Sequence, residues 1–381
     1  MSKAWPLVKL GEVIRQRKEF ITIDDTQEYM RCRVQLHAKG IVLRDRVTGS
    51  EIKTKQQQVC QAGEFLVAEI DAKVGGYGIV PDELENSIVS SHYFLFTLDH
   101  SKLNTKFLDY YSQTPAFREQ VNAKGSTNYA AIRPHEVLNY TIPLPHLAEQ
   151  QRIVAKIERL AGKIEEAITH KKEIVKEYSS MLHGIFNRLT KDSPMIEIEK
   201  IAPLIRRAVN VCMEEEYPEL GIKSFGKGTF HKPALNYLSI GNKRLYRIEP
   251  GDLVFNNVFA WEGAIAVAQP HDIGKFGSHR FITCVAKQGI STANFICFYL
   301  LAPEGLNKIG DASPGGAGRN RTLGLEKLAK IQIPLPDYKK QLYFDRLHSK
   351  VKNILSQLKQ TENQLNAMLP SILDKAFKGK L

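Results

Sequence analysis

The sequence contains few cysteines and no pattern that would join them. The five cysteines among 381 residues are scattered, and no two form a CxxC pair. A disulfide framework or a zinc ribbon needs closely spaced pairs, so both classes are excluded and reduced thiols are expected. No apolar run approaches the ~20 residues that span a bilayer. The first residues, MSKAWPLVKLGEV, lack the apolar stretch of a secretory signal. We therefore expect a soluble, cytoplasmic protein.

Motifs of catalysis are also missing. No GxxxxGK[ST] phosphate loop occurs, and Asn256-Asn257-Val258-Phe259 lacks both prolines of an Asn/Asp-Pro-Pro-aromatic methyltransferase motif. Glu51 and Asp82 stand in the wrong order for a Pro-Asp…Glu-x-Lys nuclease site, so solvated surface charge is the better interpretation. The histidines show no HExxH or other ligand spacing. We expect no catalytic residue, cofactor site or metal site in this chain.

Negative charge is under-represented. The 53 Lys and Arg residues exceed the 41 Asp and Glu residues, which gives a net charge of +12 at pH 7. Such a surplus favours a polyanionic partner, because Lys and Arg replace the counterions of a phosphate backbone. A merely basic soluble protein is the alternative, so charge alone leaves nucleic-acid binding open.

The two halves of the chain repeat each other. Ile142-Pro143-Leu144-Pro145 recurs 191 residues later as Ile333-Pro334-Leu335-Pro336. Two shorter matches keep nearly the same offset: Gly63-Glu64-Phe65 with Gly251-Asp252-Leu253, and Ser91-His92 with Ser278-His279. Several matches in one order are not expected by chance, so they indicate an internal duplication.

Each half has a mixed part and a helical part. In the first ~140 residues of each half, short runs of Val, Ile, Phe and Tyr are broken by Gly, Asp and Asn, which predicts strands and turns with some helix. After each IPLP segment, apolar residues recur in alternating steps of three and four, the a/d spacing of a coiled coil. The expected interface residues are Ile153, Ile157, Leu160, Ile164, Leu347, Val351, Ile354, Leu358 and Leu365.

A 40-residue helix is ~60 Å long, and its apolar stripe is unstable in water. We expect the two helices to pair antiparallel with one mixed domain at each end; packing of each helix on its own domain is the alternative. Two similar domains on a stiff rod suit two different half-sites on duplex DNA, whose major groove returns about every 34–36 Å.

The predicted fold is therefore α+β with a pseudo-twofold internal repeat. Two similar mixed α/β domains are separated by two long helices that form an antiparallel coiled coil. The predicted boundaries are 1–144 for the first domain, 145–191 for the first helix, 192–335 for the second domain and 336–381 for the second helix.

Four segments resemble one known family. WPLVKLGEV (5–13), GSTNYAAIRPHEVLNYTIPLP (125–145), IPLPHLAEQQRIVAKIERL (142–160) and SILDKAFKGKL (371–381) are similar to segments of the specificity subunits of type I restriction–modification systems. They resemble that family's start, domain–helix boundary, central conserved region and ending. The second helix start, PLPDYKKQLYF, departs from the pattern because it replaces the Glu-Gln-Gln run of the first.

The resemblance implies a non-catalytic DNA-binding subunit that recognises a bipartite asymmetric site with a nonspecific spacer. It implies two copies of an adenine-N6 methyltransferase that uses S-adenosylmethionine as partners. Restriction subunits, which are motor-nucleases that use ATP and Mg, can join them. In such complexes the target-recognition domains read DNA, while the coiled coil and the domain bases dock the methyltransferases.

Three pairs of loops carry residue types suited to DNA. Arg and Lys suit guanine, Asn and Gln suit adenine, and glycine lets the backbone approach closely. The loops are KGSTNY (124–129) with GAGRNR (316–321), KVGGY (73–77) with WEGA (261–264), and KFGSHR (275–280) with SSHY (90–93). The candidate DNA-binding residues are Lys73, Tyr77, Ser91, His92, Lys124, Ser126, Thr127, Asn128, Tyr129, Arg133, Trp261, Lys275, Ser278, His279, Arg280, Arg319, Asn320 and Arg321.

Each candidate has a structural alternative. The loop at 124–129 could simply close its domain, Trp261 could belong to the core, and His92 could make a structural hydrogen bond. The basic run Arg15, Arg17 and Lys18 and the pair Arg206-Arg207 occupy similar places in the two halves. They suit phosphate contacts or solvated faces equally.

Two other functions stay open at this point. The chain could be a coiled-coil scaffold that binds proteins. The basic surplus and the paired basic loops disfavour this alternative. It could also be the specificity subunit of another DNA-defence system, because one recognition scaffold can serve different effectors.

Overall fold

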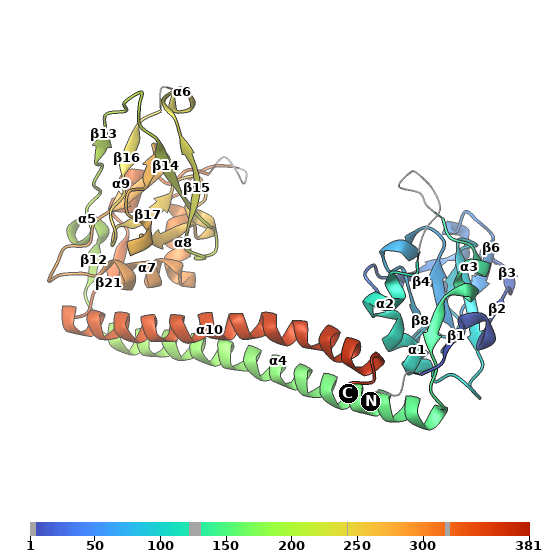
Figure 1. Cartoon of the computed structure of the whole chain (residues 1–381). Helices are drawn as coiled ribbons and strands as arrows, with labels where there is room; N and C mark the ends of the chain where they lie inside the picture. Colours follow the sequence, from blue (N-terminus) through green and yellow to red (C-terminus); the bar gives the residue numbers. More distant parts are fainter. Residues whose placement is uncertain (1–4, 122–130, 242, 317–320) are drawn as a thin grey trace. The chain divides into compact units, whose positions relative to one another are not determined.

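The computed structural model describes residues 5–121, 131–241, 243–316 and 321–381 (Figure 1). Its contacts divide the chain into two compact units. Unit 1 comprises Met1–Lys172 and Leu358–Leu381, and unit 2 comprises Glu173–Gln357. Among the described residues, no helix has the length and apolar character needed to cross a membrane. The division of the sequence into two domains (1–144 and 192–335) and two helical segments (145–191 and 336–381) stays a prediction.

Unit 1 contains two main sheets and a short strand pair. The four-stranded sheet has the order β2-β10-β7-β8, the five-stranded sheet β3-β6-β9-β4-β5, and β1 pairs with β11. The strands are β1 (Leu7–Lys9), β2 (Ile14–Arg17), β3 (Phe20–Thr22), β4 (Glu28–Val34), β5 (Ile41–Thr48), β6 (Gln56–Val59), β7 (Phe65–Ala68), β8 (Tyr77–Ile79), β9 (Ile88–Val89), β10 (Tyr93–Leu98) and β11 (Thr141–Pro143). The helices are α1 (Thr105–Ser112), α2 (Pro115–Arg118) and α3 (Pro134–Asn139), with 3-10 turns η1 (Leu10–Glu12), η2 (Gly49–Glu51), η3 (Asp71–Val74) and η4 (Asp82–Leu84).

Unit 2 repeats this plan. Its sheets have the orders β18-β17-β20 and β13-β16-β19-β14-β15, and β12 pairs with β21. The strands are β12 (Met195–Glu197), β13 (Ala208–Val209), β14 (Tyr217–Ile222), β15 (Thr229–Leu235), β16 (Leu245–Arg247), β17 (Leu253–Asn256), β18 (Ile265–Val267), β19 (Phe276–Ser278), β20 (Phe281–Cys284) and β21 (Gln332–Pro334). The helices are α5 (Ile198–Ile201), α6 (Tyr237–Ile240), α7 (Ala293–Leu301), α8 (Pro303–Asp311) and α9 (Leu325–Ala329), with 3-10 turns η5 (Ala260–Glu262) and η6 (Pro270–Asp272). The predicted α+β fold with an internal repeat is confirmed.

The tip of one hairpin shows how closely the backbone repeats. The turn between β4 and β5 docks on η3, and the turn between β14 and β15 docks on η5. The bonds are His37 N to Val74 O (2.7 Å), Ala38 N to Gly75 O (2.9 Å), Phe225 N to Glu262 O (2.8 Å) and Gly226 N to Gly263 O (2.9 Å). In all four bonds the donor and acceptor residues are the same number of positions apart in the sequence, although their side chains differ between the two units. The duplication therefore preserves backbone geometry where the sequence no longer shows it.

A buried ion pair also recurs. The Arg17 guanidinium donates to Glu64 (2.5 and 2.7 Å), and that of Arg207 donates to Asp252 (2.6 and 3.0 Å). Both carboxylates are buried and both belong to the repeated Gly-acid-apolar segment. Arg17 and Arg207 thus bind the protein itself, which accounts for their matching places without a phosphate contact.

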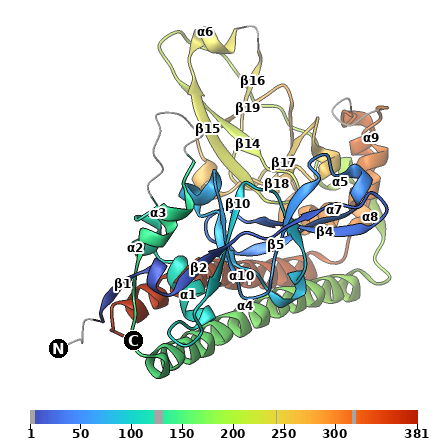
Figure 2. The same cartoon turned by 90° about the vertical axis from the view of Figure 1, so that its right-hand side faces the viewer.

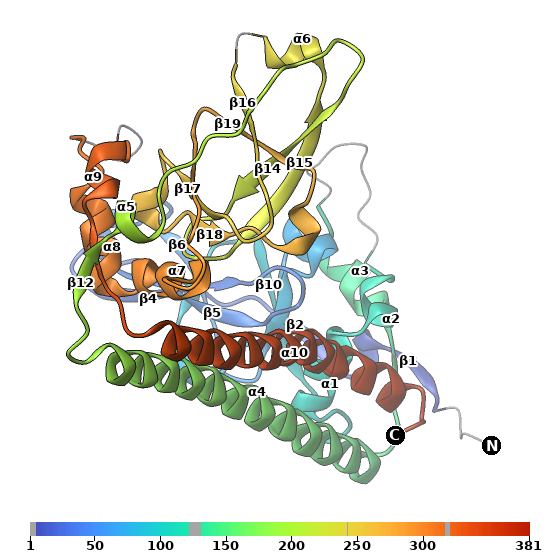
Figure 3. The same ribbon diagram turned by 90° about the vertical axis from the view of Figure 1, so that its left-hand side faces the viewer.

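The two long helices pair antiparallel within each unit. Helix α4 (Leu147–Thr190) has 44 residues and α10 (Tyr338–Phe377) has 40. In unit 1, Ile153 and Ile157 of α4 share a core with Leu373 near the end of α10. In unit 2, Phe186 near the end of α4 lies edge-on to Phe344 near the start of α10, with ring centroids 5.3 Å apart. Figures 2 and 3 show the two helices side by side.

The seam departs from the predicted spacing at one point. Leu347 and Val351 pack in the unit 2 core, but Ile354 is 36% exposed and Leu355 packs instead. The predicted seam alternates steps of three and four residues, but the buried positions 347, 351 and 355 are separated by two consecutive steps of four. Such a local change of the heptad repeat is called a stutter. The prediction for Ile354 is therefore wrong by one residue. The remaining predicted positions, Leu160, Ile164, Leu358 and Leu365, are half-buried.

A polar layer interrupts the apolar seam. Lys171 of α4 is buried, and its ammonium group donates to the carboxylate of Glu362 on α10. A polar pair at a coiled-coil core position lowers stability but specifies register, because a shifted register would leave the charge unpaired. This pair therefore favours one alignment of the helices in unit 1.

Matching glutamines fix the start of each long helix. The Gln150 amide donates to Lys102 O and Pro145 O (both 2.8 Å), and its oxygen accepts from Asn104 N (2.8 Å). Gln341 repeats this arrangement with Ile290 O (3.0 Å), Pro336 O (2.8 Å) and Thr292 N (3.1 Å). PLPDYKKQLYF therefore retains the glutamine that matters structurally, although its neighbours differ from the Glu-Gln-Gln run.

Replacing Gln150 with Leu should destabilise unit 1. The change leaves one buried N–H and two buried carbonyls without a partner, which should lower the free energy of unfolding by about 1–3 kcal/mol. Urea denaturation followed by circular dichroism measures this loss. Gln151→Leu is the matched control because its side chain is exposed. Equal stability of the two variants would contradict the role of Gln150.

Candidate nucleic-acid interface

Strands β7 and β17 end at matching residues that each hold two incoming segments. Glu69 N donates to His92 O (2.8 Å), and Glu69 O accepts from Ile132 N (2.9 Å). Asn257 N donates to Arg280 O (2.9 Å), and Asn257 O accepts from Leu323 N (2.8 Å). In both units the strand end therefore brings together the segment before β10 or β20 and the segment after a predicted DNA-binding loop.

Most residues of the predicted loops 124–129 and 316–321 lie outside the part of the chain that the structure describes. Lys124, Ser126, Thr127, Asn128, Tyr129, Arg319 and Asn320 lie outside the described residues. Their contact with DNA stays a prediction. Arg133, which follows the first loop, and Arg321, the last residue of the second, are described and lie close in sequence to Ile132 and Leu323, which bond to the strand ends.

The strand register corrects one sequence match. Tyr93 of β10 pairs with Ala68, and Phe281 of β20 pairs with Asn256. Ala68 and Asn256 occupy equivalent positions in the two repeats, and so do Tyr93 and Phe281. His92 is therefore equivalent to Arg280, and Ser91 is equivalent to His279. The match of Ser91-His92 with Ser278-His279 is therefore wrong by one residue. Strand pairing decides the register because a one-residue slip turns every side chain to the other face.

In unit 1 two candidate residues share one carboxylate. Glu69 accepts from the Arg133 guanidinium (2.7 Å) and lies 2.8 Å from His92 Nδ1. The Glu69 side chain is largely buried, whereas those of His92 and Arg133 are mostly exposed. The structural hydrogen bond considered for His92 is thus present. It also holds two basic side chains at the surface, where they remain available to a ligand.

In unit 2 Asn257 stands at the position of Glu69, and an aromatic residue of the following turn η5 holds a cation instead. The Trp261 indole Nε1 donates to Val258 O (3.0 Å), and the Arg321 guanidinium lies 5.1 Å from the centroid of its ring. Both side chains are half-buried. A guanidinium held against an aromatic face is partly desolvated and keeps its N–H groups at the edge, where they can donate to bases or phosphates.

Tyr77 is not a DNA-binding residue. Its side chain is 1% exposed, and its ring lies 5.2 Å from that of Phe117 in the unit 1 core. The prediction for Tyr77 is wrong, because strand β8 turns this side chain inward. The neighbouring glycine also has a structural role: Gly75 (φ 80°) ends η3 in the left-handed region, as Gly263 (φ 77°) ends η5.

A basic pocket occurs in both units, and the sequence predicted only part of its lining, namely Ser278, His279 and Arg280 in unit 2. In unit 2 it is lined by Lys232, Lys243, Ser278, His279 and Arg280 together with Glu219. In unit 1 the matching pocket is lined by Arg31, Arg44, Lys53, Gln57, Ser90 and Tyr93 together with Glu51. Polar and cationic side chains thus surround a concave surface at the same place in the repeated sheet.

The hairpin bulge explains why the pocket repeats. The pairing of β4 with β5 shifts between Arg31 and Cys32, and that of β14 with β15 shifts between Pro218 and Leu220. A bulge re-aims the side chain of the extra residue. Arg44 and Lys232 occupy this matching region, so each unit directs a cation into its pocket.

The charges of the unit 1 pocket differ in availability. Arg31 donates twice to Asp45 (both 2.7 Å), and this hydrogen bonding holds the pKa of Asp45 below its ordinary value. Arg44 is exposed, with its Nε 3.6 Å from the Asp45 carboxylate, and Arg33 and Arg46 are exposed on the same hairpin outside the pocket lining. Arginines two residues apart on both strands of a hairpin were the signal available in the sequence. The other described candidates are either exposed (Lys73, Ser91, His279) or half-buried (Lys275, Ser278).

Comparisons with known proteins agree with this architecture. The type I restriction modification DNA specificity domain family matches residues 3–176. The type I restriction enzyme MjaVIII specificity subunit of Methanocaldococcus jannaschii is 25% identical over 189 residues, which are 47% of this chain and 44% of that protein. The alignment thus spans less than half the length of this curated relative.

Two solved structures share the fold. The HsdS subunit from Thermoanaerobacter tengcongensis is 20% identical, with a TM-score of 0.61 over 100% of this chain and 98% of its own. A chain from a study of complex assembly and conformational transition of the type I R-M system is 21% identical. Its TM-score is 0.71, over 100% of this chain and 99% of its own.

The class of protein follows from fold and family together. The two solved structures, at 20% and 21% identity, share the fold of this chain along its whole length. Residues 3–176 match the type I restriction modification DNA specificity domain family. The recognition made from the sequence is confirmed: the chain is a relative of the DNA specificity subunits of type I restriction–modification systems.

Replacing Arg280 with Ala should weaken binding to duplex DNA of random sequence. Each phosphate contact contributes about 0.9 to the slope of log affinity against log salt, so the slope should fall by about that amount. Fluorescence anisotropy at several salt concentrations measures it. The control is Lys287→Ala, which removes the same charge beyond the other end of β20. Equal changes in both variants would contradict an interface at Arg280.

Proposed function

We propose that this chain recognises a bipartite, asymmetric DNA sequence with a nonspecific spacer and directs separate catalytic subunits to it. The observation that carries the proposal is the repeated basic pocket beside the repeated strand end. Each unit presents cations and hydrogen-bond donors on the same backbone framework. Such groups suit phosphate oxygens and the base edges of guanine and adenine.

The two units should read different half-sites because their matching side chains differ. Arg31 of unit 1 corresponds to Glu219 of unit 2, and His92 corresponds to Arg280. An acidic residue accepts from cytosine N4, whereas arginine donates to guanine, so one exchange changes the preferred base. The shared backbone supports a common docking mode, and the divergent side chains support two specificities.

The chemistry is proposed to reside in partner subunits. The curated relative is named as a type I restriction enzyme specificity subunit, and one solved relative comes from work on type I complex assembly. By this analogy we infer a non-catalytic chain that binds two adenine methyltransferases carrying S-adenosylmethionine. Restriction subunits that use ATP and Mg would join the same complex, in the cytoplasm where the DNA lies.

A binding selection tests the proposal directly. The chain is purified with the products of its genomic neighbours, and bound fragments are selected from randomised duplex DNA. We expect two short, different motifs at one fixed spacing. Salt-sensitive binding with no enriched motif would overturn sequence recognition and favour a scaffold. Partners other than methyltransferases would assign the chain to another DNA-defence system.

Variants at the bulge should separate the two half-sites. Arg44→Ala in unit 1 should relax preference at one motif, and Lys232→Ala in unit 2 should relax the other, each by about 1–3 kcal/mol or 5- to 150-fold. Competition with singly mismatched duplexes measures the preference. Loss at both motifs from either variant would contradict the assignment of one half-site to each unit.

A further inference from the structure

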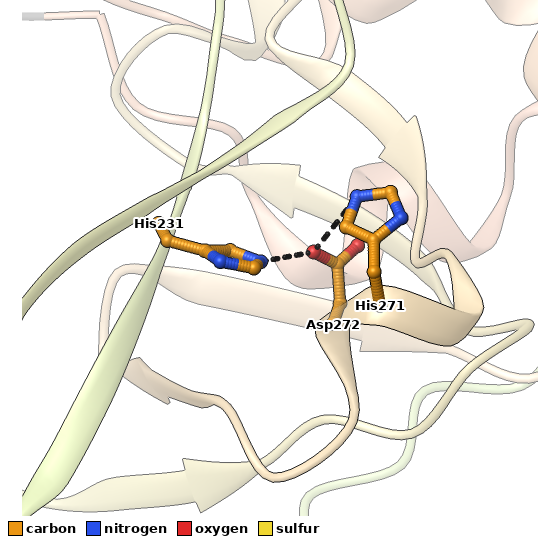
Figure 4. Close-up of side chains that lie close together, drawn as sticks. All are labelled: His231, His271 and Asp272. Carbon is orange, nitrogen blue, oxygen red and sulfur yellow. Dashed lines mark hydrogen bonds and ion pairs between the residues drawn. The ribbon is translucent and has the colours of Figure 1, made fainter.

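Three side chains of the metal-binding type converge in unit 2. His231 lies on β15, and His271 and Asp272 lie on η6. Asp272 Oδ1 is 2.9 Å from His231 Nε2 and 3.6 Å from His271 Nε2. The three ligand atoms all lie within 4.8 Å of one another. Figure 4 shows both imidazole rings directed at the same carboxylate oxygen.

The Asp272 carboxylate is buried, and its second oxygen accepts two hydrogen bonds from residues other than the histidines. Asp272 is 0% exposed, and its Oδ2 accepts from Thr229 Oγ1 (2.9 Å) and from Gln269 N (2.8 Å). These two bonds fix the orientation of the carboxylate and leave Oδ1 to the histidines. Metal-binding side chains are commonly oriented by such outer hydrogen bonds.

In unit 1 Glu83 stands at the position of His271, but the other two matching positions are apolar. Backbone bonds from Leu84 N to Pro81 O and from Asp272 N to Gln269 O show that η4 and η6 correspond. Leu84, at the position of Asp272, is buried, and Leu43 of β5 stands at the position of His231. A buried leucine in one repeat is thus a buried carboxylate in the other. Burying a carboxylate is unfavourable unless a cation or hydrogen bonds compensate for lost hydration.

We propose that His231, His271 and Asp272 bind one divalent transition metal ion, with zinc as the best fit. Zinc ligands at 2.0–2.1 Å in a tetrahedron lie about 3.3 Å apart, and the two distances to Asp272 Oδ1 bracket that value. Two imidazole nitrogens and one carboxylate oxygen are a zinc-type donor set, and water completes it. The exposure of the His271 side chain, 69%, gives the ion access from solvent.

The ion would tie the hairpin to the body of unit 2. His231 lies on β15 directly before Lys232, which lines the basic pocket. η6 belongs to the segment between β18 and β19. A metal that joins these segments restrains the hairpin strand that carries Lys232. Metal binding therefore stabilises unit 2, and this effect is measurable without DNA.

The decisive experiment is a zinc titration of the full-length chain after treatment with a chelator. Isothermal titration calorimetry should give one Zn²⁺ per chain, and Co²⁺ should give the visible absorption of a four-coordinate site. Zinc should also raise the Tm, because it binds the folded state. His271→Ala should weaken zinc binding at least tenfold without lowering the Tm of the metal-free protein, since this side chain is mostly exposed.

Two further variants complete the test. Asp272→Asn preserves the size of the side chain and an acceptor for Thr229, but it removes the charge and should abolish binding. His279→Ala, another exposed histidine of unit 2, should bind zinc as the unaltered chain does. No stoichiometric binding by the unaltered chain, or unchanged binding by His271→Ala, would overturn the proposal. The three residues would then form a hydrogen-bonded cluster that needs no metal.

Discussion

The pairing of α4 with α10 is the interaction on which the rest of the structure depends. Each helix carries an apolar stripe whose exposure to water would be unfavourable by roughly 25 cal/mol per Å². Ile157 meets the end of α10 in unit 1, and Phe186 meets its start in unit 2. Each unit therefore includes a part of both helices, so the core of unit 1 is completed by the last residues of the chain.

Polar contacts decide the geometry that apolar burial leaves open. An apolar seam tolerates several registers, but Lys171 reaches its partner Glu362 in one of them. Gln150 and Gln341 fix the geometry at the starts of the long helices. Their side-chain oxygens accept hydrogen bonds from the chain segments that directly precede α1 and α7. The positions of the sheets on the helices thus follow from a few fully bonded buried groups.

The duplicated framework would allow one architecture to carry the two specificities proposed above. The Arg17–Glu64 and Arg207–Asp252 pairs hold the matching starts of β7 and β17 in both units. Beyond them, the side chains of the loops and bulges can diverge more freely, since many of them are exposed and lie outside the cores. Replacement of an arginine by Glu219 in the pocket shows that this freedom has been used. The buried carboxylate of Asp272 shows that divergence also reached one core position.

The sequence by itself determined the α+β fold, the internal repeat and the family, because heptads and IPLP segments are local patterns that survive divergence. Tertiary structure alone decided which residues face outward. Tyr77 is buried, His92 corresponds to Arg280, Leu355 replaces Ile354 in the seam, and the basic pockets and the His231 cluster arise from distant segments. Each depends on strand pairing or helix packing between residues far apart in the chain, and no local spacing specifies such contacts.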